Sequence, residues 1–259
     1  MPNLKVGKNQ VEYNQIGGGP DLLLLPTLLA EMTVYDDVID ELSARYRVTR
    51  INFPGFGGST GPIGQTVDSY ADLVAETMSA LCLSGDTHVV GNGFGGFVAG
   101  SLAIHHGRSF KKLVLVDTGP GFPEPAKEPL RILAKKAQTE GMDSVLDAAI
   151  KRMFPEDFIR NNPSIMERRR LHLSKADPFL FANAALALTF LDNRPRLGEI
   201  KNPTQIIVGL ADATTPPALS YELNSGISNS ELQELPGIGH CPQLQDPRLF
   251  LDAMLTFLK

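Results

Sequence analysis

Three stretches of the chain carry residue types that could do chemistry. Asp212 follows the apolar run QIIVG, and His240 follows the run ELQELP, while the glycine-rich turn GNGFGG follows HVV and leads into a helix of small residues. Carboxylates and imidazoles carry out acid–base catalysis. A glycine turn between a strand and a helix holds either a phosphate or a nucleophile.

The first interpretation of the turn is a dinucleotide site. Gly91, Gly93 and Gly96 satisfy the pattern G-x-G-x-x-G after a strand and before a helix. Asp117 follows about 20 residues later, where an acidic residue binds a ribose hydroxyl. In this interpretation Gly93 lets the backbone approach a pyrophosphate, whose charge the start of the helix stabilises.

The second interpretation is a nucleophile elbow. Residues 91–95, GNGFG, match G-x-S-x-G except that Gly93 stands where the serine belongs. Glycine tolerates the strained backbone of an elbow more easily than serine does. The turn alone does not decide between the two interpretations.

The elements that must position these residues follow an α/β pattern. Short apolar runs recur along the chain, as expected of strands buried on both faces of a parallel sheet, namely DLLLLP, RVTRINF, THVV, KKLVLVDT, TQIIVG and ELQELP. Apolar residues at helical spacing predict helices over 66–85, ended by Gly85, and over 246–259. Residues 119–202 show only helical patterns, so we expect a cap inserted into a core domain formed by 1–118 and 203–259.

With this order of turn, acid and histidine, the chain resembles the α/β-hydrolase superfamily over essentially its whole length. The resemblance implies an α/β-hydrolase fold, a mostly parallel doubly wound sheet with a helical cap before the strand that carries the triad acid. It also implies that Asp212 and His240 form a hydrogen-bonded catalytic pair, with Gly93 at the nucleophile position. A dinucleotide-binding protein has no use for either side chain, so the resemblance favours the elbow.

The resemblance further implies an oxyanion hole formed by the N–H groups of Leu28 and Phe94. The loop that supplies Leu28 usually begins His-Gly, whereas here it reads Pro26-Thr27. Backbone donors survive changes of side chain, so we expect the hole to persist with an altered shape.

Other hydroxyl and thiol groups could replace the missing nucleophile. We expect Ser101 to be a core residue of its helix and the side chain of Cys241 to point away from the working edge of His240. Thr27 lies nearest to the expected oxyanion hole. For the substrate pocket we predict Thr27 together with three of the phenylalanines, Phe122, Phe154 and Phe181.

Several functions are compatible with this site. Asp212 and His240 could activate a water in the space left by the missing hydroxymethyl group, and so hydrolyse a small, partly apolar ester, lactone, amide or β-dicarbonyl C–C bond. The pair could instead serve a cofactor-free lyase or oxygenase as a proton-transfer base. Two further alternatives are a ligand-binding protein without activity and a serine hydrolase in which the serine was replaced by Gly93.

Composition and charge narrow the partners. The 259 residues have a net charge of −5, which argues against binding to nucleic acid or to an anionic membrane. We expect the short basic run Arg168-Arg169-Arg170 to be a solvated helix face, with an anchor for an anionic group as the alternative. Two cysteines without metal or redox spacing predict no metal site, and we expect no cofactor. We expect a cytoplasmic protein, monomeric or homodimeric, that acts on a small molecule.

Overall fold

The apolar runs form the parallel part of the sheet. In the computed structural model, which describes residues 1–259, six parallel strands have the bounds β3 (Asp21–Leu25), β4 (Arg47–Ile51), β5 (His88–Asn92), β6 (Lys112–Val116), β7 (Thr204–Gly209) and β8 (Ser230–Leu235). Every residue of β3, β5 and β7 is buried, as expected for strands covered on both faces.

Two further strands precede these six. β1 (Asn3–Val6) pairs antiparallel with β2 (Asn9–Ile16), which pairs antiparallel with β4. The full order is β1-β2-β4-β3-β5-β6-β7-β8. The carboxyl ends of the parallel strands therefore lie at one edge of the sheet, where the candidate site residues follow them.

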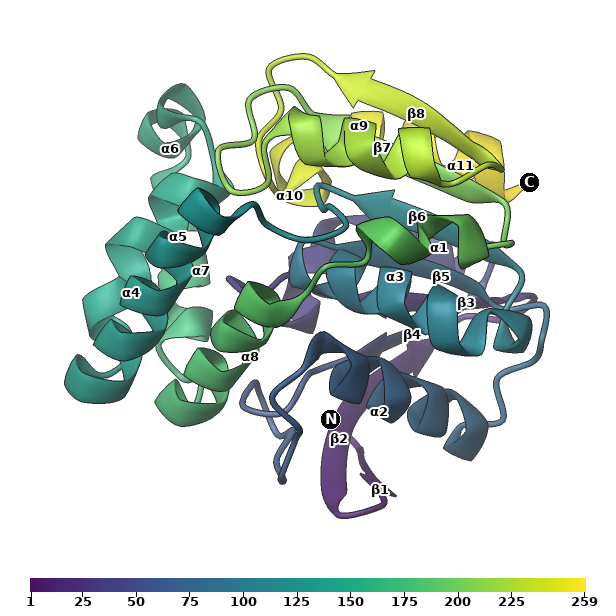
Figure 1. The fold of residues 1–259 in the computed structure, drawn as a ribbon, viewed down its shortest axis with the longest axis horizontal. Coiled ribbons are helices and arrows are strands. Elements are labelled where there is room, and N and C mark those ends of the chain that lie inside the picture. The colour runs from purple at the N-terminus through teal and green to yellow at the C-terminus, as the bar shows by residue number, and fades with distance from the viewer.

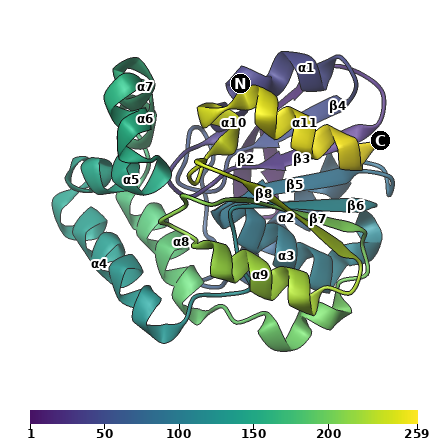
Figure 2. The same cartoon turned by 90° about the horizontal axis from the view of Figure 1, so that it is seen from above.

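Helices cover both faces of the sheet. One face carries α2 (Val67–Ala80), α3 (Phe94–His106) and α9 (Pro217–Gly226), and the other carries α1 (Ile39–Ser43), α10 (Pro242–Gln245) and α11 (Pro247–Leu258) (Figure 2). The side chains of Thr66 and Asp246 cap the first turns of α2 and α11. Our prediction that Gly85 ends α2 is wrong, because the helix ends at Ala80 and Cys82 already adopts a left-handed backbone with φ 51°.

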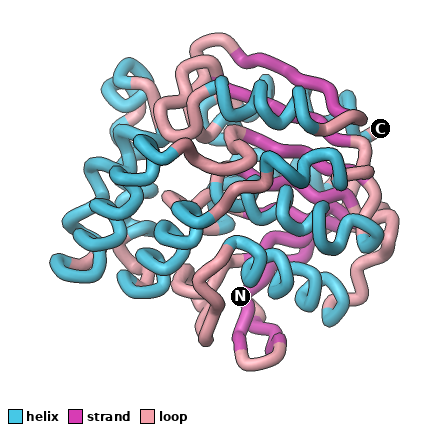
Figure 3. Tube along the Cα trace, viewed as in Figure 1, coloured by secondary structure: helices cyan, strands magenta, loops and turns pink.

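The segment between β6 and β7 contains helices and no strands. Its helices lie beyond one end of the sheet, and loops fill the space between them and the strand ends (Figures 1 and 3). They are α4 (Glu124–Glu140), α5 (Leu146–Met153), α6 (Glu156–Asn161), α7 (Pro163–Leu173) and α8 (Pro178–Phe190). Short 3-10 helices occupy Met32–Val38, Gly107–Ser109, Met142–Val145 and Arg194–Glu199. We call residues 119–202 the cap, a division proposed from the sequence.

The basic run of the cap is not simply a solvated face. Arg169 is only 2% exposed, and its Nη2 donates a hydrogen bond of 3.0 Å to the Thr33 hydroxyl of the core. Arg170 pairs with Asp147 on α5, while Arg168 is exposed. The run therefore joins α7 to the core and to a neighbouring cap helix. None of the helices combines the length and the apolar content needed to span a bilayer.

Candidate active site

The turn after β5 has the backbone of an elbow. Gly93 adopts φ 54° and ψ −117°, a left-handed conformation that favours glycine, and α3 begins at the next residue. A Cβ atom on Gly91 would lie 2.2 Å from the carbonyl oxygen of Gly95, and one on Gly95 would lie 2.3 Å from that of Leu25. Close approach of the backbone therefore requires glycine at both positions.

Asp212 and His240 meet at the carboxyl edge of the sheet. His240 Nδ1 lies 2.9 Å from Asp212 Oδ2, and both side chains are buried. The other carboxylate oxygen, Oδ1, accepts the backbone N–H groups of Thr214 and Thr215 at 2.7 and 3.2 Å. A carboxylate accepts hydrogen bonds, so this contact favours the tautomer of His240 with the proton on Nδ1, in which Nε2 is the acceptor.

Backbone contacts hold His240 in place from two sides. Asn92 Nδ2, next to the elbow, donates to the His240 carbonyl at 2.9 Å, while Gln243 Nε2 donates to Asn92 Oδ1 at 3.0 Å. From the cap, the Met153 carbonyl accepts the His240 backbone N–H at 3.0 Å. The histidine loop is thus tied to both the elbow and the cap, a role of Asn92 that no sequence pattern indicated.

Thr27 occupies the place where the elbow serine would be. Its Oγ1 lies 3.0 Å from His240 Nε2, and it would lie 2.3 Å from a Cβ atom on Gly93. This corrects the expectation that a water fills the space beside Gly93. The hydroxyl group of Thr27 already fills it, and Thr27 itself is only 2% exposed.

The residues of the expected oxyanion donors line one cavity together with Thr27. Leu28 follows Thr27 directly, and Phe94 follows Gly93 at the start of α3. Neither N–H donates to a hydrogen bond among the turns and loops, where the Pro26 carbonyl instead accepts the N–H of Gly95 at 3.0 Å. Two unpaired N–H groups at the wall of one cavity can stabilise a developing oxyanion.

A small cavity of about 30 Å³ opens onto these groups. Its lining is mostly apolar and consists of Thr27, Leu28, Leu29, Gly93, Phe94, Phe97, Phe122, Leu130, Leu133, Arg152, Leu188, Thr214, Thr215 and His240. A volume of this size has room for one or two water molecules, so an ester substrate fits only when side chains that line the cavity move.

Two predicted substrate contacts do not reach the cavity. Phe154 stacks on Phe158 with ring centroids 5.2 Å apart, and Phe181 packs against Phe56 at 6.3 Å. Both side chains are buried in the apolar core, and neither lines the cavity. Our predictions for these two residues are therefore withdrawn.

The remaining candidates for a nucleophile have structural partners. Ser101 is fully buried and accepts a hydrogen bond of 3.0 Å from Asn193 Nδ2. Cys241 is also fully buried, with its Sγ directed at Asn92 Oδ1, 3.9 Å away. Neither lines the cavity, whereas Thr27 does.

Asp117, the residue that the dinucleotide interpretation assigned to a ribose, is buried at the end of β6. Its Oδ1 accepts the Gly209 N–H at 2.7 Å, and its Oδ2 has no hydrogen-bond partner. Burial, together with the charge of Asp212, raises the pKa of Asp117 well above its usual value of 3.8. Burial and the nearby charge of Asp212 thus disfavour a second negative charge beside His240.

We expect the stability of Asp117→Asn to depend less on pH, as pH rises above about 4, than the stability of the unchanged protein. The folded chain keeps a proton on Asp117 that the unfolded chain releases above pH 3.8, so rising pH favours unfolding until the folded pKa is reached. In that window the contribution is about 1.4 kcal/mol per pH unit. Asparagine keeps the acceptor for Gly209 and tolerates the left-handed φ of 46° at this position.

Denaturant unfolding, measured at several pH values between pH 4 and neutrality, gives this difference. The free energy of unfolding of Asp117→Asn should fall less steeply with pH than that of the unchanged protein. The exposed Asp37→Asn, which removes a carboxylate without ion pairs, is the control and should follow the unchanged protein. Parallel curves for all three proteins would contradict a buried proton on Asp117.

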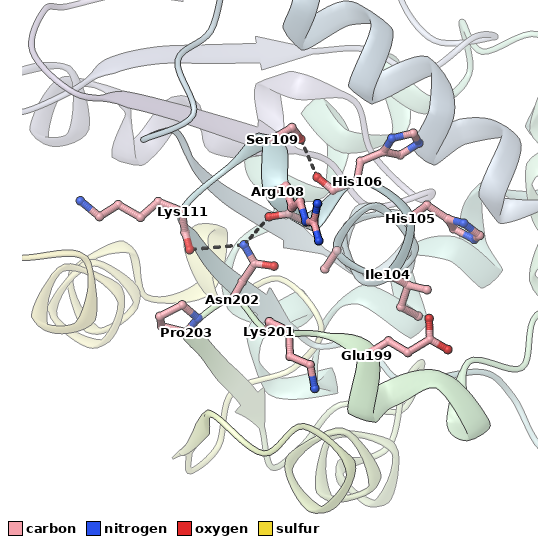
Figure 4. A pocket seen from close by; sticks show the side chains of 12 residues that line it. Ile104, His105, His106, Arg108, Ser109, Lys111, Glu199, Lys201, Asn202 and Pro203 are labelled. Atoms are coloured by element: carbon pink, nitrogen blue, oxygen red, sulfur yellow. Dashed lines mark hydrogen bonds between the residues drawn. The ribbon is translucent and has the colours of Figure 1, made fainter.

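A larger hollow lies at the opposite end of α3. It has a volume of about 800 Å³ and is lined by polar side chains that include His105, Arg108 and Lys201 (Figure 4). Asn202 Nδ2 donates to the carbonyls of Gly107 and Phe110 there, each at 2.9 Å. These contacts hold the loop before β7, and none of the residues predicted for the active site lies in this hollow.

Comparison with known proteins agrees with this geometry. A model of the alpha/beta hydrolase family matches residues 22–253. A 2-hydroxy-6-oxononadienedioate/2-hydroxy-6-oxononatrienedioate hydrolase of Paraburkholderia phymatum is 28% identical over 96% of this chain and 91% of its own. The polyketide synthase ThaQ of Burkholderia thailandensis is 28% identical over 97% of this chain, which spans only 12% of that much longer protein.

Among solved structures, the enol-lactonase of Burkholderia xenovorans LB400 is 26% identical, with a TM-score of 0.94 over 99% of both chains. The eight-stranded sheet, the family match and this likeness decide between the two interpretations of the glycine turn. The chain belongs to the α/β-hydrolase family and is a hydrolytic enzyme.

Proposed function

We propose that the protein hydrolyses a small, partly apolar ester or lactone, with Asp212 and His240 as the catalytic base and the N–H groups of Leu28 and Phe94 as the oxyanion hole. One observation carries the proposal: His240, whose Nδ1 lies 2.9 Å from Asp212 Oδ2, lines the same cavity as Leu28 and Phe94. Base and oxyanion donors thus face the same small space, as acyl transfer requires.

The chemistry needs three contributions from the chain. Asp212 fixes the tautomer of His240 and stabilises the imidazolium that forms when Nε2 takes a proton from the attacking hydroxyl group. The oxyanion donors stabilise the charge that develops on the carbonyl oxygen. His240 then returns the proton to the leaving group. The apolar wall of the cavity strengthens each of these electrostatic interactions by excluding water.

Arg152 indicates the class of substrate. This residue of α5 lines the cavity, is only partly exposed and forms no ion pair. Its own backbone carbonyl accepts the Thr214 hydroxyl at 2.8 Å, which fixes α5 beside Asp212. The wall is mostly apolar, and an arginine without an ion pair among its lining residues favours a substrate with a carboxylate. The name of the Paraburkholderia relative describes a dicarboxylate substrate, which supports the same proposal.

The test is a comparison of paired substrates: half-esters and lactones with a free carboxylate, and the same compounds with that carboxylate methylated. We expect hydrolysis of both kinds, with kcat/KM higher for the carboxylate by about 10-fold to 100-fold. Arg152→Gln should remove most of this preference by raising KM for the carboxylate substrates alone. Lys151→Gln, which removes an exposed charge on the same helix, is the matched control.

The outcomes separate two parts of the proposal. Hydrolysis without a carboxylate preference would overturn the role of Arg152, while the proposed ester and lactone hydrolysis would stand. Failure to hydrolyse any ester or lactone in the panel would overturn the proposed substrate class.

A further inference from the structure

We propose that Thr27 is the covalent nucleophile of this enzyme, so that the triad is Thr27, His240 and Asp212 and the elbow residue Gly93 only provides room. The proposal rests on the proposed function, since it names the group that attacks the ester in that same site. It moves the nucleophile from the loop after β5 to the loop after β3.

The first support is the direction of the hydrogen bonds. With the proton of His240 on Nδ1 and directed at Asp212, Nε2 can only accept, so the Thr27 hydroxyl donates to it across 3.0 Å. A hydroxyl group that donates to a histidine, itself oriented by a carboxylate, is the arrangement that activates nucleophiles. His240 is the only hydrogen-bond partner of the Thr27 hydroxyl, so its lone pairs are available for attack.

The second support is the position of the hydroxyl relative to the oxyanion donors. In an ordinary elbow, one donor is the residue after the nucleophile and the other comes from the loop after β3. Here Leu28 becomes the residue after the nucleophile, and Phe94 becomes the donor from the opposite loop. The same pair of N–H groups therefore serves a nucleophile on either loop, and both residues line the cavity with Thr27.

The third support is that Thr27 and Gly93 exclude a larger side chain at the elbow. A Cβ atom on Gly93 would lie 2.3 Å from Thr27 Oγ1, 2.9 Å from Thr27 Cβ and 2.5 Å from His240 Nε2. Contacts below 3.0 Å to a buried threonine and to the catalytic ring cannot be relieved by a flexible chain end. Glycine at 93 is thus what allows Thr27 to reach His240.

The reaction proceeds in two balanced halves. Thr27 Oγ1 attacks the carbonyl carbon while His240 Nε2 takes the hydroxyl proton, and the alcohol leaves with that proton as the acyl–Thr27 ester forms. A water then gives its proton to Nε2 and attacks the acyl–Thr27 carbonyl. Thr27 leaves with the proton from His240, and the carboxylic acid is released.

The test traps the acyl–enzyme and, separately, removes the hydroxyl group of Thr27. The full chain is mixed with 4-nitrophenyl acetate, quenched in acid and analysed by intact-mass and peptide mass spectrometry, with a fluorophosphonate as a second probe. We expect one acetyl or phosphonyl group on the peptide that contains Thr27. We expect Thr27→Val, which keeps the shape but lacks the hydroxyl group, to lose the adduct and at least about 100-fold in kcat.

Two further variants complete the design. Thr27→Ser keeps the hydroxyl group and should keep the adduct and activity. Thr77→Val makes the same substitution at a buried residue of α2 outside the site, where the hydroxyl only donates to the Leu73 carbonyl, and should leave activity unchanged. Thermal unfolding of each variant shows that the fold is retained.

Three results would overturn the proposal. If Thr27→Val keeps its rate while His240→Ala loses it, water attacks the ester directly and Thr27 is at most a positioning residue, although the proposed function stands. If the adduct maps to another residue, the nucleophile is that residue. If both Thr27→Val and His240→Ala still hydrolyse the ester at the original rate, this proposal and the proposed function are overturned together.

Discussion

Gly93→Ser, which completes the ordinary elbow sequence, is expected to lower kcat/KM by at least about 100-fold instead of raising it. The new Cβ would lie 2.3 Å from Thr27 Oγ1 and 2.5 Å from His240 Nε2, so it must push these two groups apart. Their hydrogen bond of 3.0 Å would be lost. Overpacking of a buried site costs about 1–3 kcal/mol, so the free energy of unfolding should fall as well.

Thr27→Gly in the same chain should reverse this loss. It clears the space that the serine needs, and it restores the glycine that α/β-hydrolases usually have in the loop after β3. We expect the double variant to exceed both single variants in kcat/KM by at least about 10-fold, which is a strongly non-additive result.

The control for this comparison is Gly141→Ser. Gly141 also has a positive φ, 81°, but nothing lies within 4 Å of its Cβ position. This variant therefore introduces backbone strain without a steric clash at the new Cβ atom, and we expect it to retain activity. If Gly93→Ser instead raises activity in the presence of Thr27, the contact between the two loops is not what excludes a serine.

The fold could be predicted where burial leaves a mark on the sequence. Strands such as Asp21–Leu25 and Thr204–Gly209 are buried on both faces and read as unbroken apolar runs. β1 and β2 were not predicted, because most of their residues are polar and only partly buried or exposed, so they form no apolar run. The end of α2 was also missed, because the left-handed position that follows this helix is occupied by Cys82 and not by a glycine.

The site could be predicted in part for a similar reason. The order of elbow, acid and histidine is a property of the chain, and the fold brings His240 within 2.9 Å of Asp212. The distance between Thr27 and Gly93 is a tertiary property, because it depends on how two loops 66 residues apart approach each other across the sheet. The pattern showed that a serine was missing, but it could not show that a threonine filled its place.

The contribution of the cap was hidden for another physical reason. Arg152 lies in an amphipathic helix among several other charged residues, and only the docking of α5 on the histidine loop brings it to the cavity. Phe154 and Phe181 were equally apolar in the sequence, yet they pack in the core. Asp117 showed the spacing of a ribose ligand, although its place at the end of a central strand buries it.

The measurement that tests the account most directly is kcat/KM for one activated ester or lactone in the unchanged protein and in His240→Ala. His240→Ala removes the base and retains Asp212 and the oxyanion hole, and it should lower kcat/KM by at least about 10³-fold. His106→Ala, which removes a partly exposed histidine that lies far from the cavity and pairs with Asp72, is the control and should keep the full rate. Thermal unfolding of both variants excludes a general loss of folded protein. A His240→Ala protein that is folded and within about 10-fold of the original rate would contradict hydrolysis by the Asp212–His240 pair.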